Sequence, residues 1–118
     1  MNARPTIMLP GLQVEVARSF AQRLVGLLGR RALAADRGLL ITPCNNIHTA
    51  FMRFPIDVVF VDRDAKVLSI CPHLGPFRAA VSRRARACLE LRSGGAAAHG
   101  IEVGQCLAPL LPVLEGHR

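Results

Sequence analysis

The run Ile56–Val61 constrains the fold of this chain more than any other stretch, because five of its six residues are β-branched or aromatic. An apolar run of this kind, without alternation, is typical of a strand that is covered on both faces. Asp57 interrupts the run, and a carboxylate inside a buried strand costs several kcal/mol unless it is paired. We therefore expect a central strand whose acidic residue has a partner, and the candidates are His48, Thr49, Arg53 or a backbone N–H.

Turn-forming residues divide the rest of the chain into short elements. Pro10-Gly11 separates two runs that predict a hairpin, and Ser19 with Gln22 forms a capping-box pattern ahead of leucines at helical spacing. A short helix is expected over about residues 19–29, and one helical turn over 96–99. The expected strands cover 6–9, 12–17, 38–42, 56–61, 66–71, 87–91 and 103–107. This pattern favours a mainly β fold, a compact β-sandwich or barrel with one short N-terminal helix and one minor helical turn.

The size and composition fit one domain, 1–118, because the chain has 118 residues of which 51% are hydrophobic. Its cysteines form no Cys-x-x-Cys pair, so buried reduced thiols are expected rather than a zinc knuckle. We see no signal peptide, and no apolar run approaches the roughly 20 residues of a membrane span. The sequence predicts a soluble, cytoplasmic protein without a membrane partner.

The net charge of +7 comes from basic residues that are spread along the whole chain. Arg30-Arg31 and the run 83–86 are the local clusters, and the sequence contains no Tyr or Trp to stack on bases. Net charge alone indicates only non-specific attraction. Nucleic acid is therefore not an expected partner, and the arginines are interpreted as solvated surface residues.

The residues just before the central strand carry the candidate chemistry. His48 can serve as an acid, a base or a ligand, and Asp57 can orient its ring or accept a donor from a substrate. Glu90 lies between two leucines as Asp57 lies in its own strand, so the two carboxylates are candidates to face a common polar pocket. Structural hydrogen bonding of His48 and Asp57, and a solvent-facing Glu90, are the alternatives.

Cys44, His48 and Met52 follow one another at intervals of four residues, and this spacing raises two more specific hypotheses. Cys44, His48 and Met52 offer donors for a soft metal, but residues four apart on a strand stand about 13 Å apart, too far to share one ion. Cys44 with His48 and Asp57 could form a nucleophilic cysteine site, although no family-specific pattern supports it. We expect no metal and no cofactor.

Four segments of the chain resemble the domain of unknown function 192 family over about residues 15–108. They are Gly26-Leu27-Leu28-Gly29-Arg30, Gly38-Leu39-Leu40-Ile41, the long stretch His48–Phe60, and Leu89-Glu90-Leu91 with Gly94. We call residues 48–60 the central motif. The resemblance implies a compact, mainly β fold with a small helix near the N-terminus, and a motif whose residues line a common region. It implies no activity, and some members carry export signals.

The chain departs from the family pattern at two places. Ala65 stands where the turn after the central strand usually ends in Gly, and Ala resists a positive φ, so the turn type is in question. Gln105 follows Gly104 where the family often has Asp, so a charge-dependent role there is lost or reduced to hydrogen bonding.

The function expected from these residues is binding of a small polar ligand. The pocket would be bordered by His48, Thr49, Met52, Arg53, Asp57 and Glu90. One alternative is a small hydrolase-like or acid/base enzyme that uses His48 and Asp57. Another is a purely structural polar network in a protein that interacts through its arginine-rich surface.

Overall fold

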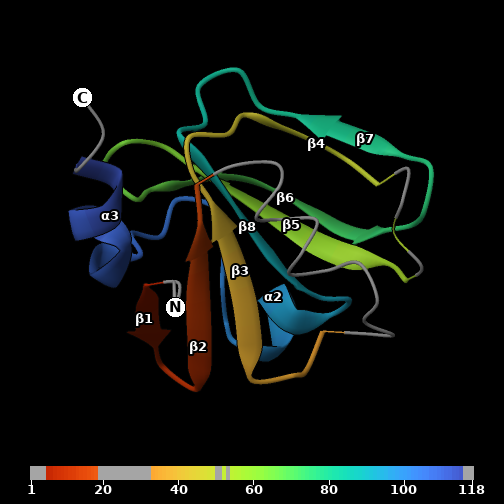
Figure 1. The fold of residues 1–118 in the computed structure, drawn as a ribbon, viewed down its shortest axis with the longest axis horizontal. Coiled ribbons are helices and arrows are strands. Elements are labelled where there is room, and N and C mark those ends of the chain that lie inside the picture. Colours follow the sequence, from red (N-terminus) through yellow and green to blue (C-terminus); the bar gives the residue numbers. More distant parts are fainter. Residues whose placement is uncertain (1–4, 19–32, 50–51, 53, 116–118) are drawn as a thin grey trace.

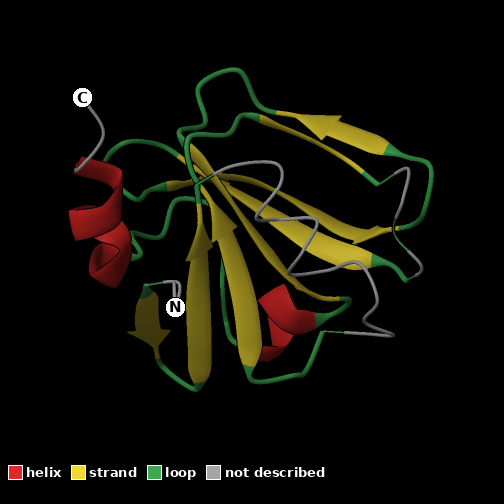
Figure 2. Cartoon of the chain, in the orientation of Figure 1, coloured by secondary structure: helices red, strands yellow, loops and turns green. Residues whose placement is uncertain are grey.

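The computed structural model describes residues 5–18, 33–49, 52 and 54–115, which form a six-stranded sheet and a small two-stranded sheet (Figure 1). The large sheet has the order β1-β2-β3-β8-β5-β6, and β4 pairs with β7. The strands are β1 (Thr6–Leu9), β2 (Leu12–Ala17), β3 (Arg37–Ile41), β4 (Asn46–His48), β5 (Ile56–Val61), β6 (Val67–Leu74), β7 (Ala79–Val81) and β8 (Ala87–Arg92). The helices are α2 (Gly95–Ala98), the 3-10 helix η1 (Ala108–Leu110) and α3 (Leu111–Glu115), as Figure 2 shows.

The expected central strand is confirmed as β5, which pairs antiparallel with β6 on one side and with β8 on the other. All six of its residues are buried. The hairpin about Pro10-Gly11 is also confirmed as β1 and β2. The mainly β class is therefore confirmed, and the strands pair antiparallel except for β2 and β3, which run parallel.

Several boundaries differ from the expectation. Residues 103–107 are not a strand: Cys106 makes one isolated bridge to Lys66, and Val103 and Gly104 form a turn. No strand was expected between residues 71 and 87, yet the end of β6 and all of β7 lie there. Residues 108–115, for which no element was expected, fold as η1 and α3. The expected helix over 19–29 lies outside the described residues.

The turn between β5 and β6 keeps its tight form despite lacking glycine. Ala65 adopts a φ of 62°, so the expectation that alanine would avoid this conformation is wrong. Its N–H donates to the Asp62 carbonyl at 3.0 Å, and the Asp62 side chain accepts from the backbone N–H groups of Asp64 and Lys66. Ala65 is fully buried, so packing of its methyl group offsets part of the conformational cost.

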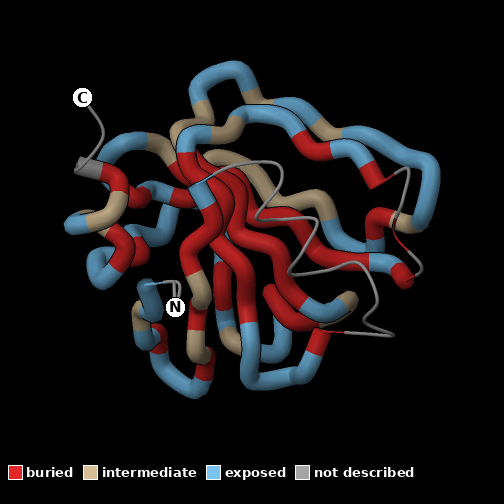
Figure 3. The backbone as a smooth tube through the Cα atoms, in the orientation of Figure 1, coloured by how far each residue is buried: buried red, intermediate tan, exposed pale blue. Residues whose placement is uncertain are grey.

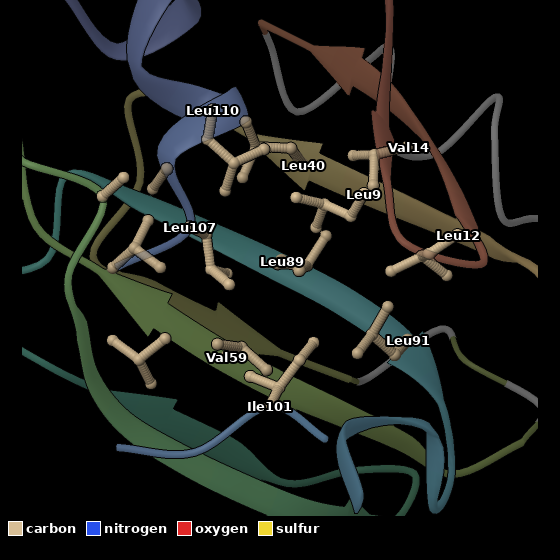
Figure 4. Packing of buried hydrophobic residues seen from close by; sticks show 14 of the residues in the cluster. Leu9, Leu12, Val14, Leu40, Val59, Leu89, Leu91, Ile101, Leu107 and Leu110 are labelled. Atoms are coloured by element: carbon tan, nitrogen blue, oxygen red, sulfur yellow. The ribbon is translucent and has the colours of Figure 1, made fainter. Parts of the chain in front are cut away.

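The large sheet is covered on both faces, which explains why its central strands lack an exposed side (Figure 3). On one face Val59 and Leu89 pack with residues that follow β8, and Figure 4 shows Ile101 beside Val59 and Leu110 beside Leu40. We call this the C-terminal face, because Leu107, Leu110 and Leu114 cover it. No helix in the described part of the chain is long and apolar enough to cross a membrane.

The opposite face of the sheet carries a second apolar cluster built from β3, β5 and β8. Val58, Phe60 and Cys88 lie on it together with Ile47 of β4, and the motif residues Met52 and Phe54 pack there too. We call it the motif face. Residues of the central motif thus reach both faces, since successive side chains of β5 alternate between them.

Candidate functional site

Asp57 is held by three backbone N–H groups and is almost fully buried. Its Oδ1 accepts from His73 at 2.9 Å and from Gly94 at 3.0 Å, while its Oδ2 accepts from Ala96 at 3.0 Å. These contacts join β5 to β6 and to the turn that enters α2. Backbone N–H groups were among the expected partners of Asp57, and this expectation is confirmed. Both of its carboxylate oxygens accept hydrogen bonds that connect parts of the fold.

Asp57 and Glu90 do not share a pocket, so that hypothesis is wrong. Asp57 lies on the same side of β5 as Val59, which belongs to the C-terminal face, and bonds Ala96 of that face. Glu90 pairs with Val58 across β8 and β5, and Val58 belongs to the motif face. The alternation of side chains along a strand sends the two carboxylates to opposite sides of the sheet. Glu90 is fully buried, so the solvent-facing alternative for it is also wrong.

Thr49 is fully buried and holds the loop between β6 and β7. Its hydroxyl donates to the Gly75 carbonyl at 2.6 Å and accepts from the Arg78 N–H at 2.9 Å. Its backbone N–H donates to the Arg78 carbonyl, and its carbonyl accepts from Phe77. Two residues of the central motif, Thr49 and Asp57, are therefore committed to backbone hydrogen bonds.

His48 is exposed and lines a cavity of about 460 Å³ at the end of β4. This volume falls within the range of small-molecule sites in proteins. We call it the β4 cavity. Its walls are formed by residues 41 and 43–48 from one part of the chain and by Ala85 and Arg86 from the turn before β8.

Backbone contacts hold the two walls of the β4 cavity together. The N–H of Cys44 donates to the Arg86 carbonyl at 2.9 Å, and the N–H of Ser82 donates to the Asn45 carbonyl at 2.9 Å. The side-chain amide of Asn46 donates to the Asn45 side-chain oxygen at 3.0 Å. These contacts preform the cavity, so its polar groups lie on a fixed frame rather than on a free loop.

The remaining candidates lie elsewhere. Met52 is buried among the apolar side chains of the motif face, and Arg53 lies outside the described residues. Of the expected pocket residues that the structure describes, His48 lines the β4 cavity and Thr49 bonds the loop between β6 and β7. Asp57 lies on the C-terminal face of the sheet, and Met52 and Glu90 lie on the motif face. His48 and Asp57, the expected acid and base, are not brought to the same cavity.

Cys44 and His48 do share a cavity, as the hypotheses of a metal or a nucleophile required. The third residue of each hypothesis does not line this cavity: Met52 was the third metal donor, and Asp57 was the group that would orient His48. The Cys44 thiol donates to the Asn46 carbonyl at 3.0 Å. Within the described ranges, no three His, Cys, Asp or Glu side chains are grouped to hold a metal ion.

Sequence reasoning missed Asn45, Asn46 and Arg86 as site residues. Asparagines in a loop after proline are common turn formers, and Arg86 belongs to a cluster that is typical of a solvated surface. Arg86 is half-buried and lies some forty positions from His48 in the sequence, so only the pairing of residues 44–46 with the turn before β8 brings them together. One feature of the sequence could have indicated a different role for Arg86: Ala85 separates it from Arg83 and Arg84 in the basic cluster.

Two solved structures are similar to this fold. A protein from Sinorhizobium meliloti 1021, provisionally described as a transcription regulator, has a TM-score of 0.71 and 25% sequence identity, covering 88% of this chain and 93% of its own. A protein of unknown function from Novosphingobium aromaticivorans DSM 12444 has a TM-score of 0.67 and 25% identity, covering 84% of this chain and 79% of its own. No curated protein matches the sequence at significant similarity.

The family model matches residues 5–108, which include the central motif, all eight strands and α2. The family is described as an uncharacterized ACR, so it brings no activity to the site. The match extends farther toward the N-terminus than the resemblance over residues 15–108 indicated, and it includes the β1–β2 hairpin. On this evidence the chain belongs to the domain of unknown function 192 family, DUF192.

Proposed function

We propose that this protein binds a small polar ligand in the β4 cavity. The observation that carries the proposal is the composition of the cavity wall, in which a histidine, two asparagines and an arginine surround about 460 Å³ of space. Convergent polar groups in a preformed concave site are typical of small-molecule binding. The ligand site therefore includes His48 but not Asp57, Thr49 or Met52.

The wall of the β4 cavity supports a ligand that is rich in hydrogen-bond acceptors. Asn45, Asn46 and Arg86 all carry N–H donors, and the described lining residues include no Asp or Glu. Ile41 and Ile47 supply apolar lining that suits a short carbon skeleton. A carboxylate-bearing or carbonyl-bearing metabolite fits both properties, because arginine pairs with such groups through charge-assisted hydrogen bonds.

A thermal-shift screen with a metabolite library tests this proposal, since a ligand that binds the native state raises its apparent stability. We expect at least one compound to raise the melting temperature of the native protein. The shift should be lost in the variants His48→Ala and Asn46→Ala, each of which removes one polar group from the wall.

The protein offers a matched control in a second cavity of about 450 Å³, which lies beside α2 and is lined in part by Asp36, Arg92, Ser93 and His99. Ser93→Ala changes that cavity and leaves the β4 cavity intact, so it should retain the ligand shift. If every ligand found binds equally well to His48→Ala and Asn46→Ala, the β4 cavity is not the site and the proposal fails.

A further inference from the structure

The loop between β6 and β7 presents the most exposed large apolar side chain of the described structure. Phe77 is 80% exposed, and it adopts a φ of 60°. A bulky residue at positive φ is uncommon, and such a conformation persists only where the surroundings impose it. The loop lies at one extremity of the long axis of the molecule, at the right of Figure 1.

Thr49 imposes this conformation through the contacts described above. It bonds Gly75, Phe77 and Arg78 with its hydroxyl and its backbone groups, and the Thr49 side chain is fully buried. A residue of the central motif therefore holds the backbone at Phe77, at the tip of the loop. Because this backbone is already ordered, the loop loses little conformational entropy when Phe77 contacts a partner.

The stretch of sequence that contains Phe77 is basic. Residues 65–89 contain no Asp or Glu, and the five bases among them are Lys66, Arg78, Arg83, Arg84 and Arg86. Arg78 follows Phe77 directly and is exposed, and Arg83 and Arg84 lie exposed beyond the other end of β7. Between them Ala79 and Val81 of β7 face outward, and Val81 is 65% exposed. We call the edge from Phe77 to Arg84 the β7 edge.

We propose that the β7 edge attaches the protein to membrane surfaces rich in anionic lipids, with Phe77 inserted among the headgroups and the arginines paired with phosphates. The β7 edge consists of one three-residue strand with its adjoining loops, which offers little of the roughly 800 Å² per partner that a stable protein interface buries. A lipid surface requires no matching shape, and it binds apolar anchors flanked by cations. The sequence predicted no membrane partner because no run could span a bilayer, and surface contact needs no span.

The absence of Trp and Tyr from the sequence makes a direct test simple. Phe77→Trp places a single tryptophan at the tip, so its emission reports on that side chain alone. With vesicles of equal parts phosphatidylglycerol and phosphatidylcholine we expect a blue shift and quenching by brominated lipid. With phosphatidylcholine alone we expect neither change.

Met8→Trp is the matched control, because Met8 is 61% exposed and lies on β1, away from the β7 edge (Figure 1). Its emission should remain unchanged with both kinds of vesicle. An unchanged Phe77→Trp spectrum, or equal shifts of both reporters, overturns the proposal. A shift of Phe77→Trp with an RNA oligonucleotide or an acidic protein, but not with anionic vesicles, overturns the lipid assignment and assigns the edge to that partner.

Two further variants of the Phe77→Trp protein separate the role of each group. Arg83→Gln should lower partitioning onto anionic vesicles about fivefold, since each basic side chain near such a surface contributes a similar factor. Thr49→Val should weaken insertion because it releases the loop, while Thr49→Ser should restore it because the hydroxyl returns. Circular dichroism checks that each variant is folded. If the folded Arg83→Gln variant and the folded Thr49→Val variant both partition as the Phe77→Trp protein does, the proposed geometry is contradicted.

Discussion

Two groups of polar residues within the segment 44–57 have different environments in this structure. Thr49 and Asp57 are fully buried or nearly so, and their side chains are occupied by backbone groups. The residues Cys44–His48 are less buried, except for Ile47, and they line the β4 cavity. The comparison teaches that the buried polar residues Thr49 and Asp57 are bonded to the backbone of their own chain, while the exposed polar residues of 44–48 lie at a cavity.

The physical reason for this division is the cost of burying polar groups. A carboxylate in the interior must be compensated by the protein itself, because a ligand that dissociates would leave it unpaired. Asp57 meets this requirement with three N–H groups that belong to the chain. His48 is exposed, so water solvates its side chain and no comparable burial cost arises.

The largest effect is expected for Asp57→Ala, which removes the acceptor of three buried N–H groups. We expect the free energy of unfolding to fall by about 4 kcal/mol, because each hydrogen bond to a charged group contributes about 1.5–3 kcal/mol and the three are not additive. Urea denaturation monitored by circular dichroism measures the change. Asp57→Asn should cost less, since its remaining oxygen can still accept. A loss below about 1 kcal/mol for Asp57→Ala would show that the Asp57 carboxylate is not needed to stabilise the fold.

A smaller loss is expected for Thr49→Val, which keeps the shape of the side chain and removes its hydroxyl. The Arg78 N–H and the Gly75 carbonyl lose their partner, which should cost about 2 kcal/mol. The same denaturation experiment measures the loss, and Thr49→Ser is the matched control because it retains the hydroxyl. Equal stability of the valine and serine variants would mean that the loop is held by the backbone contacts alone.

Asp62 tests whether the burial of a hydrogen-bonded carboxylate, and not the hydrogen bonds alone, determines how much it stabilises the fold. Its Oδ1 accepts from two backbone N–H groups, as Asp57 Oδ1 does, but in an exposed turn. Water can replace these bonds, so Asp62→Ala should cost only about 1 kcal/mol in the free energy of unfolding. A loss as large as that of Asp57→Ala would show that the turn, not burial, sets the magnitude.

The sequence was sufficient for β1, β2, β3, β5, β6 and β8, and for the existence of a partner for Asp57. The unbroken apolar run of β5 predicted its central place, and the cost of burial predicted that its carboxylate is bonded. The sequence could not show which face each side chain occupies relative to another strand, because that depends on the register of β5 with β8. For the same reason it could not separate Glu90 from Asp57.

The β4 cavity was beyond sequence reasoning for a related cause. Its two walls come from segments that are distant along the chain, and no periodicity links Arg86 to Asn46. The strand β7 was also missed, since three residues with two alanines give no strand signal. Without β7, nothing in the sequence indicated that the turn before β8 lies beside Cys44.

The smallest effect on stability is expected for His48→Ala, and this variant sharpens the comparison most. Substitution of an exposed surface side chain usually changes the free energy of unfolding by less than about 0.5 kcal/mol. If His48 lines a ligand site, its removal should abolish a ligand-induced thermal shift while leaving the denaturation midpoint of the free protein unchanged. Asp57→Asn should behave in the opposite way, with lower stability and a retained shift. If instead His48→Ala lowers the stability and Asp57→Asn abolishes the thermal shift, then His48 stabilises the fold and Asp57 contacts the ligand, which contradicts the proposed roles.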